Sequence, residues 1–141
     1  MIEHTSTFRV MYPDTDQMGT VHHSNYVKYY ETARWELLRA IGISYKSVEE
    51  AGYMLPVIKM NFHFLKTTEY DALLTVKTTL KETKGARIWF SYKLYNEKKE
   101  LINQAETELA FVNRETWKPC ATPQFIVDAI ALNQTIELYH A

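Results

Sequence analysis

Two carboxylates and two imidazoles lie close together in the run YPDTDQMGTVHHSNYVKYYE, between residues 12 and 31. The acids are Asp14 and Asp16, and the histidines are His22 and His23. A plain connection between two elements needs turn residues and does not need this set of side chains. A carboxylate can attack a carbonyl carbon or take a proton from water, so the run is a candidate site for hydrolysis or acyl transfer.

Asp16 is the stronger candidate for a reacting carboxylate, because it is nearer to Gly19 and to the helix predicted after it. Gly19 has no side chain and would let a ligand approach the backbone closely. A helix start presents unpaired N–H groups and the positive end of the dipole, which can stabilise an oxyanion. A turn role is the alternative for Asp16. For Asp14, which follows Pro13, we expect a turn residue whose carboxylate bonds its own backbone.

The two histidines allow more than one interpretation. Together with the carboxylates they are ligand types that zinc or iron accepts. Adjacent histidines rarely point the same way, however, and no further cluster of ligand residues follows, so we predict no metal site. We expect one histidine to hydrogen-bond within the loop and the other to line a pocket. His22, with Tyr26 on the helix, is assigned to substrate binding.

Other charged residues are weaker candidates. Glu31 has Arg34 three residues later, and an intrahelical ion pair is expected. In a cleft, Glu31 would instead be a reserve acid or base. Lys84 and Arg87 flank Gly85 in a predicted hairpin, where they either form a solvated turn or bind a phosphorylated ligand.

The composition is that of an ordinary globular chain of one domain. It has 141 residues, of which 46% are hydrophobic and 23% charged, and a formal net charge of −1. That charge gives no overall field for nucleic acid or an anionic membrane. No secretion signal or run of membrane-spanning length is found, and the single cysteine, Cys120, is interpreted as a passive thiol in a reducing compartment. The sequence therefore predicts a soluble, cytoplasmic protein.

The elements that must position the candidate residues follow from hydrophobic periodicity. Residues 6–12 predict a strand that Pro13 ends. A helix is predicted from Ser24, its N-cap, to Gly42, which stops it, and a short second helix is expected around residues 47–51. Apolar residues at spacings of three and four form the helix stripe. The stripe consists of Tyr26, Tyr30, Ala33, Leu37 and Ile41.

From Leu55 onward the period changes to two and predicts four long strands. Short connections between the last three strands predict an antiparallel meander. The tail over residues 123–140 has weak helical periodicity and is expected to form a terminal helix. One antiparallel sheet wrapped around one long helix, an α+β fold over residues 1–141, buries the helix stripe most simply. The last three strands are DALLTVKTTLKET, RIWFSYKLYNE and ELINQAETELAFVN.

The run around Asp16 resembles the signature of the 4-hydroxybenzoyl-CoA thioesterase family, in its branch of small bacterial acyl-CoA thioesterases. That signature has an aromatic residue, Asp-x-Asp-x-x-Gly-x-Val, a short stretch ending in Asn-Tyr, and a helix with Glu-x-x-Arg. A second stretch, NFHFLKTTEYDALLTV, is similar to a strand of the family and the acidic residue after it. The resemblance covers roughly residues 5–120. The match runs through Asp14, Asp16, Gly19, Val21, His23, Asn25, Tyr26, Glu31 and Arg34.

The resemblance implies the hotdog fold, with dimers or tetramers that place active sites between subunits. It also implies that Asp16 is the catalytic carboxylate and that backbone N–H near His23 polarises the thioester carbonyl. The substrate would be an acyl-CoA, or an acyl-carrier-protein thioester. No metal or redox cofactor is indicated, and coenzyme A enters only as part of the substrate. We expect Met54 and Val57 to line the apolar groove.

Two other functions fit the same fold. A hydroxyacyl-thioester dehydratase or hydratase would need a histidine and a helix carboxylate, and His22 with Glu31 is the available pair. A non-catalytic acyl-CoA binder would need neither. Thioester hydrolysis is the preferred hypothesis, because Asp16 lies in the motif that is associated with that reaction in the family.

Overall fold

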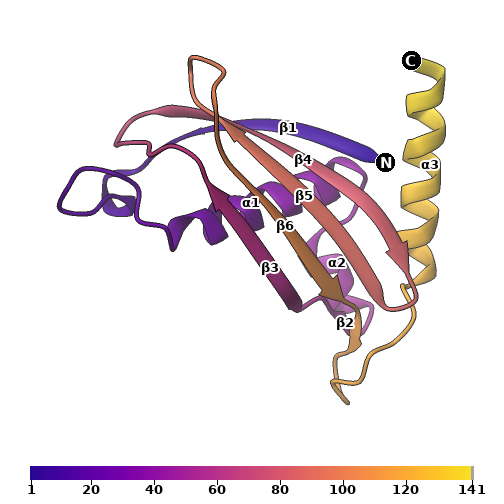
Figure 1. Cartoon of the computed structure of the whole chain (residues 1–141). Coiled ribbons are helices and arrows are strands. Elements are labelled where there is room, and N and C mark those ends of the chain that lie inside the picture. Colours follow the sequence, from indigo (N-terminus) through magenta and orange to yellow (C-terminus); the bar gives the residue numbers. More distant parts are fainter. Residues whose placement is uncertain (141) are drawn as a thin grey trace.

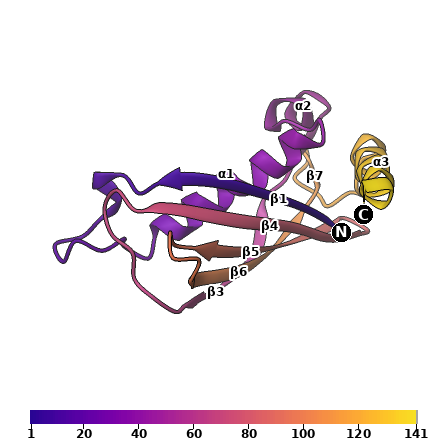
Figure 2. The ribbon, with the colours of Figure 1, turned by 90° about the horizontal axis from the view of Figure 1, so that it is seen from above.

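One five-stranded antiparallel sheet and one long helix, α1 (Asn25–Ala40), form most of the molecule (Figure 1). The computed structural model describes residues 1–140, with side chains described for residues 1–134. Figure 2, seen from above, shows the strands curving around the side on which α1 lies. The predicted wrapping of an antiparallel sheet around the helix is therefore confirmed. In sheet order the strands are β1 (Ile2–Arg9), β4 (Leu73–Lys84), β5 (Arg87–Tyr95), β6 (Leu101–Ala110) and β3 (Val57–Phe64).

The long helix has the bounds that its sequence predicts. Ser24 is the N-cap, although its side chain makes no capping hydrogen bond, and Gly42 follows the last turn with φ of +88°. This left-handed conformation suits glycine and ends the helix. Tyr30 and Leu37 of the stripe are fully buried against the sheet. Burying this stripe is the main stabilisation that holds α1 on the sheet.

The three central strands form the predicted meander. β4 pairs with β5 and β5 with β6, and both pairings are antiparallel. The first connection turns at Gly85, and in the second Asn96 Oδ1 accepts the N–H groups of Lys98 and Glu100. Outside the meander, β3 pairs with β6 and β1 with β4, so β1 and β3 are the sheet edges.

The first strand begins and ends earlier than predicted. The expected strand over residues 6–12 is instead β1 from Ile2 to Arg9, and Tyr12–Asp14 forms a short 3-10 turn, η1. The chain leaves the sheet at Val10, whose N–H still donates to Ala72 O at 3.0 Å. An edge strand buries few side chains, and of β1 only Ile2 is fully buried. Burial alternates strictly along β1, but two of its inward positions carry the polar His4 and Ser6, so the apolar alternation in the sequence is weak.

Smaller elements complete the chain. The short helix α2 (Tyr45–Glu50) has Ser44 as N-cap and so begins earlier than the predicted start at residue 47. The helix α3 (Gln124–His140) lies where a terminal helix is expected, and Ile126 is buried in the core. Within the described part of the chain, no helix is long and apolar enough to cross a membrane. A two-stranded sheet pairs β2 (Tyr53–Met54) with β7 (Val112–Asn113).

A row of buried polar groups lies between α1 and the sheet. Tyr30 OH donates to Asn103 Oδ1 at 2.6 Å, and Arg34 Nη1 donates to Tyr92 OH at 3.1 Å. Tyr92 OH also shares a hydrogen bond of 2.8 Å with Thr107 Oγ1. These bonds fix how α1 rotates and slides on the sheet, because each group would lose a partner if the helix shifted.

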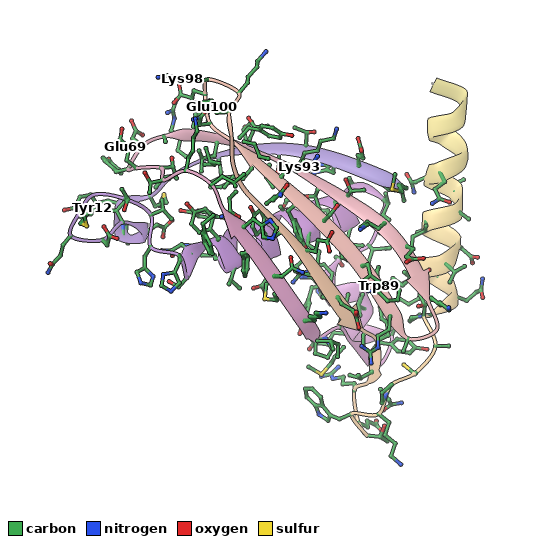
Figure 3. All side chains as sticks on the ribbon, viewed as in Figure 1. Tyr12, Glu69, Trp89, Lys93, Lys98 and Glu100 are labelled. Carbon is green, nitrogen blue, oxygen red and sulfur yellow. The ribbon has the colours of Figure 1, made fainter. Side chains whose placement is uncertain are left out.

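The face of the sheet away from α1 is polar. Figure 3 shows Trp89 and Lys93 on this face, both from β5. Trp89 Nε1 donates to Glu108 Oε1 of β6 at 2.9 Å. The acyl groove that the sequence predicts must therefore lie on the helix side or at the ends of the strands.

Candidate active site

The two candidate acids lie in a loop that extends beyond the sheet between β1 and α1 (Figure 1). The loop is a tight hairpin, because Thr15 and Val21 form an antiparallel bridge and Asp16 N–H donates to Thr20 O at 2.9 Å. Gly19 has φ of +79°, which L-residues with side chains rarely adopt. The glycine is therefore needed for the turn itself, in addition to the close approach that its small size allows.

The Asp16 side chain is exposed and held by its own loop. Its Oδ1 accepts the N–H groups of Met18 at 2.9 Å and Thr20 at 3.3 Å. The Thr20 hydroxyl lies 3.4 Å from Oδ1 and 3.5 Å from Oδ2. Backbone bonds thus fix the direction of the carboxylate, while Oδ2 keeps capacity to react with a substrate or water.

Asp14 ends the turn η1, as its sequence predicts, but its carboxylate has partners outside that turn. Its residue is only 4% exposed, and its carboxylate bonds α1 instead of its own backbone. Lys28 Nζ donates to Oδ1 at 2.6 Å, and Tyr29 OH donates to Oδ2 at 2.9 Å. The bonding to its own loop that was expected of Asp14 is made by Asp16, for which a turn role was the stated alternative.

The start of α1 presents a backbone donor beside the loop. His22 N–H donates to Asp14 O, Ser24 N–H to the His22 imidazole, and Asn25 N–H to His22 O. Within the part of the chain that the structure describes, the N–H of His23 has no acceptor. This is the backbone position at which the resemblance places carbonyl polarisation.

A groove of about 350 Å³ brings these groups together. One wall holds Asp16, both histidines and Tyr26, and the other is the stretch from Phe64 to Thr67 that follows β3. The ring centres of Tyr26 and Phe64 are 5.5 Å apart in an edge-to-face contact. The groove therefore combines an exposed carboxylate and an aromatic wall with His23, the residue whose N–H has no acceptor among the described residues.

The two histidines lie together, against the expectation that neighbours point apart. Their ring centres are 4.1 Å apart with planes inclined by 32°. His22 Nδ1 shares a 2.8 Å hydrogen bond with Ser24 Oγ, while the His23 ring makes an edge-to-face contact with Phe64 at 6.5 Å. His22 thus forms the loop hydrogen bond expected of one histidine, but both histidines line the groove.

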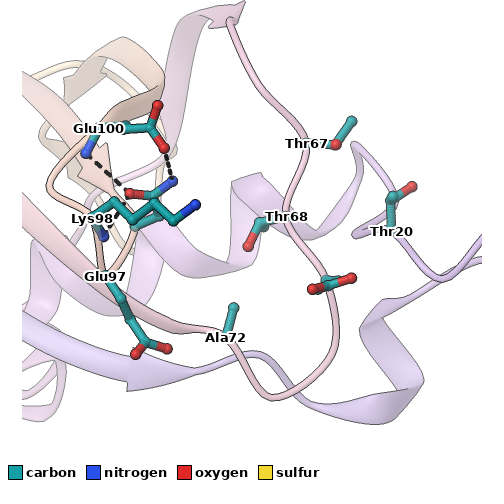
Figure 4. Close-up of a pocket in the computed structure, with 9 residues that line it drawn as sticks. Thr20, Thr67, Thr68, Ala72, Glu97, Lys98 and Glu100 are labelled. Atoms are coloured by element: carbon teal, nitrogen blue, oxygen red, sulfur yellow. Dashed lines mark hydrogen bonds between the residues drawn. The ribbon is translucent and has the colours of Figure 1, made fainter.

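A second hollow of about 480 Å³ adjoins the groove on the other side of Thr67, which lines both (Figure 4). Thr20, the hydroxyl partner of Asp16, lines this second hollow as well. Asn96 and Glu100 of the β5–β6 turn form its opposite wall, joined by a hydrogen bond of 3.0 Å. The loop that holds Asp16 is thus bordered by open space on two sides.

A family model described as "Thioesterase-like superfamily" matches residues 10–130, which include the loop, the groove and the whole sheet after β1. The chain belongs to this superfamily. The prediction of a thioester-hydrolysing enzyme is thereby confirmed, while the narrower resemblance to enzymes of 4-hydroxybenzoyl-CoA stays a prediction.

Individual relatives agree with this membership. The acyl-CoA thioester hydrolase YbgC of Escherichia coli is 33% identical over 119 residues, covering 84% of this chain and 89% of the relative. The acyl-CoA thioesterase YbgC of Haemophilus influenzae is 32% identical over 117 residues, covering 82% and 85%. The crystal structure of DHNA-CoA thioesterase from Staphylococcus aureus superposes with a TM-score of 0.88 at 29% identity, covering 100% of this chain and 97% of that one. The hotdog fold is confirmed.

Four predicted substrate-binding residues lie away from the groove of this thioesterase. Val57 begins β3 and Phe64 ends it, so the two are separated by the length of the strand. Met54 is in β2, and neither it nor Val57 lines the groove. Lys84 and Arg87 form the β4–β5 hairpin, where Arg87 makes an ion pair with Glu108 of β6.

The reserve acid, Glu31, is exposed on α1 and does not line the groove. Its expected ion pair with Arg34 does not form, because Arg34 is buried and bonds Tyr92 instead. Cys120 is half-buried, and burial raises the pKa of its thiol, as suits a passive residue. Among the described residues, no group of three or more His, Cys, Asp and Glu side chains could hold a metal ion.

The sequence interpretation missed the outer wall of the groove. Phe64, Leu65, Lys66 and Thr67 line it, although no role was assigned to them. The available signal was the second family-like stretch, NFHFLKTTEYDALLTV, which contains all four. The stretch from Phe64 to Thr67 and the start of α1 are far apart in the chain. They meet only when β3 is paired with β6, and hydrophobic periodicity in one sequence does not reveal that pairing.

Proposed function

We propose that this thioesterase hydrolyses an acyl-CoA to a free acid and coenzyme A, with Asp16 as the reacting carboxylate. The observation that carries the proposal is that one groove is lined by the exposed Asp16 and by His23, the residue before the helix N-cap whose N–H has no acceptor among the described residues. The relatives named as acyl-CoA thioesterases support the substrate class. An acyl-carrier-protein thioester would present the same reacting group.

The chemistry needs few catalytic groups. The thioester carbon is electrophilic, and its thiol leaving group has a pKa near 8.5, judged from cysteine, so no strong acid is needed to expel it. The His23 N–H, beside the positive end of the α1 dipole, would receive the oxygen on which negative charge develops. Such a donor typically lowers the barrier by about 3 kcal/mol.

Asp16 can act in either of two ways. As a nucleophile, Oδ2 attacks the carbonyl carbon, the C–S bond breaks, and a mixed anhydride forms that water then hydrolyses. As a general base, the carboxylate takes a proton from water while the water oxygen attacks. Both routes consume one water and release a carboxylic acid and a thiol. No metal or redox cofactor takes part in the proposed reaction, and coenzyme A enters only with the substrate.

The groove walls favour an apolar acyl group. Tyr26, Phe64 and Leu65 offer aromatic and aliphatic surface next to the proposed reaction centre. His22 and His23 extend that surface with a second pair of flat rings. The extent of the apolar groove surface would determine the length of the acyl chain that binds and the preference for alkyl or aryl groups.

We also propose that the chain forms dimers, or tetramers of two dimers, through the free edge of β3. This edge strand carries Ile58 at 50% and Phe64 at 55% exposure, which is unusual for apolar side chains on an unpaired strand. Edge-to-edge pairing would bury them and satisfy the strand's open backbone groups. It would also bring a second chain next to the groove at Phe64, where Lys84 and Arg87 of the partner chain could contribute.

The dehydratase alternative has weaker support. It requires Glu31 to act with His22, and only the histidine lines the groove. The non-catalytic binder would not need an exposed carboxylate beside a free N–H.

The test is thiol release from a panel of short, long and aromatic acyl-CoAs by the wild type, Asp16→Asn and Glu31→Gln. We expect turnover by the wild type and Glu31→Gln, and a loss of several powers of ten in Asp16→Asn. No thiol release from any substrate, together with hydration or dehydration of a hydroxyacyl-CoA that is lost in Glu31→Gln and kept in Asp16→Asn, would favour the dehydratase. Tight binding without turnover by any of the three would favour the binder.

A further inference from the structure

We propose that Asp14 is the positioning residue of this active site, holding the reacting carboxylate and the carbonyl-polarising N–H in one geometry. The inference rests on the proposed function, and it assigns a role to a buried acid that the proposed chemistry does not use. Asp14 itself faces away from the groove and does not line it.

Asp14 is bonded through both its side chain and its backbone to the end of the loop and the start of α1. Its carboxylate accepts from Lys28 and Tyr29, the fourth and fifth residues of α1. Its carbonyl oxygen accepts the His22 N–H at 3.0 Å and Asn25 Nδ2 at 2.9 Å. One residue in the first half of the loop thus holds four groups at the end of the loop and the start of α1.

These bonds lie immediately next to the two proposed reacting groups. Asp16 is two residues after Asp14, and the His23 N–H is one residue after the N–H of His22. The backbone between them is further closed by the bridge of Thr15 with Val21. A change in the distance between Asp14 and α1 must therefore move Asp16 relative to His23.

We call the set of hydrogen bonds that Asp14 accepts from His22, Asn25, Lys28 and Tyr29 the clamp. The bonds to its carboxylate make the clamp stiff. The Asp14 side chain is 6% exposed, so its buried bond from the Tyr29 hydroxyl competes little with water, whereas its bond from the 58% exposed Lys28 is screened by solvent. A buried carboxylate accepting from an ammonium and a phenol makes charge-assisted bonds, which are shorter and stronger than neutral ones. Misplacement of reacting groups by about 1 Å can slow catalysis about 100-fold. The clamp is thus strong enough, and close enough, to control the rate.

The test compares Asp14→Asn, Tyr29→Phe and Lys28→Met with the wild type and with Glu36→Gln. The last is an acid-to-amide change on α1. Among the described residues, the Glu36 carboxylate accepts a hydrogen bond from Arg39 only, and it lies outside the clamp. We expect kcat to fall about 10- to 100-fold in Asp14→Asn with KM changed less than about threefold, because binding groups stay in place. Tyr29→Phe and Lys28→Met should give smaller losses, and Glu36→Gln none. Combining Tyr29→Phe with Asp14→Asn should add little further loss, since both break the same contact.

Backbone hydrogen exchange separates positioning from a general loss of stability. In Asp14→Asn the His22 amide should lose protection while amides in the centre of β5 keep theirs. Unchanged kcat in a folded Asp14→Asn would overturn the inference, as would an equal loss of protection in β5 and at His22. A wild type that hydrolyses no acyl-CoA would contradict the proposed function instead, and the exchange at His22 would still decide whether Asp14 holds the loop.

Discussion

The Asp14 carboxylate should make a stabilising contribution that depends on pH. Burial raises the pKa of Asp14, but the hydrogen bonds from Lys28 and Tyr29 outweigh it, so the pKa lies below its ordinary value of 3.8. A carboxyl whose pKa is lowered by folding stabilises the folded state above its unfolded pKa. That contribution is lost as the pH falls through the lower, folded value.

The magnitude follows from the two contacts. The Tyr29 hydroxyl is buried, and a hydrogen bond to a charged group contributes about 1.5–3 kcal/mol. The Lys28 side chain is 58% exposed, so solvent screens its ion pair to about 1 kcal/mol or less. Asparagine keeps one acceptor oxygen and part of this network. We therefore expect Asp14→Asn to lower the free energy of unfolding by about 2 kcal/mol at pH 7.

The assay is urea unfolding at fixed protein concentration, followed by fluorescence of the three tryptophans. The difference between wild type and Asp14→Asn should stay constant between pH 7 and pH 5 and shrink below about pH 4. Glu36→Gln, an exposed change, should differ from the wild type by less than about 0.5 kcal/mol throughout. A gap of the same size at pH 7 and pH 3, or no gap at pH 7, would refute the reasoning.

Two further substitutions test the loop and the sheet edge. Gly19→Ala should cost about 1–2 kcal/mol of stability and lower kcat, because the residue keeps φ near +79° although nothing blocks an added Cβ. Thermal unfolding and thiol release check this, and a variant equal to the wild type in both would show that the turn tolerates a side chain. Ile58→Lys should convert the proposed dimer or tetramer to a monomer, because a charge would be buried at the paired edge. Sedimentation velocity checks this, and a wild type that sediments as a monomer would contradict the proposed assembly.

The sequence was sufficient for the elements with strong periodicity. The α1 stripe and the glycine after it located the helix to within two residues, and the meander followed from three alternating runs with short connections. The first strand was misplaced because two inward positions of β1 carry the polar His4 and Ser6, so the strict alternation of burial is not matched by an apolar alternation in the sequence. Pro13 marked the turn correctly, but the strand ended at Arg9, several residues before it.

The site was predicted in part, and the limits have a physical cause. Asp16, His22 and His23 are contiguous in the chain, so a local motif could find them. The roles of the two acids depended on tertiary contacts, because only the fold places Lys28 and Tyr29 against Asp14.

The sequence did not predict the outer wall of the groove, because that wall also depends on tertiary contacts. Met54 and Val57 were assigned to the groove as part of an apolar strand expected to face the helix. The register of β3 on β6 brings the other end of that strand, at Phe64, to the helix start. An apolar pattern identifies a strand but not which end of it meets a loop.

The central claim is that Asp16 is the reacting carboxylate of a thioester hydrolase. The most direct measurement is kcat/KM for thiol release, by the wild type and Asp16→Asn, on the best acyl-CoA of the panel. Asparagine is the right replacement, because its amide oxygen can still accept the N–H groups that Oδ1 accepts and so keep the loop in place. We predict a fall of about 1,000-fold or more. A fall of less than about tenfold would contradict the account.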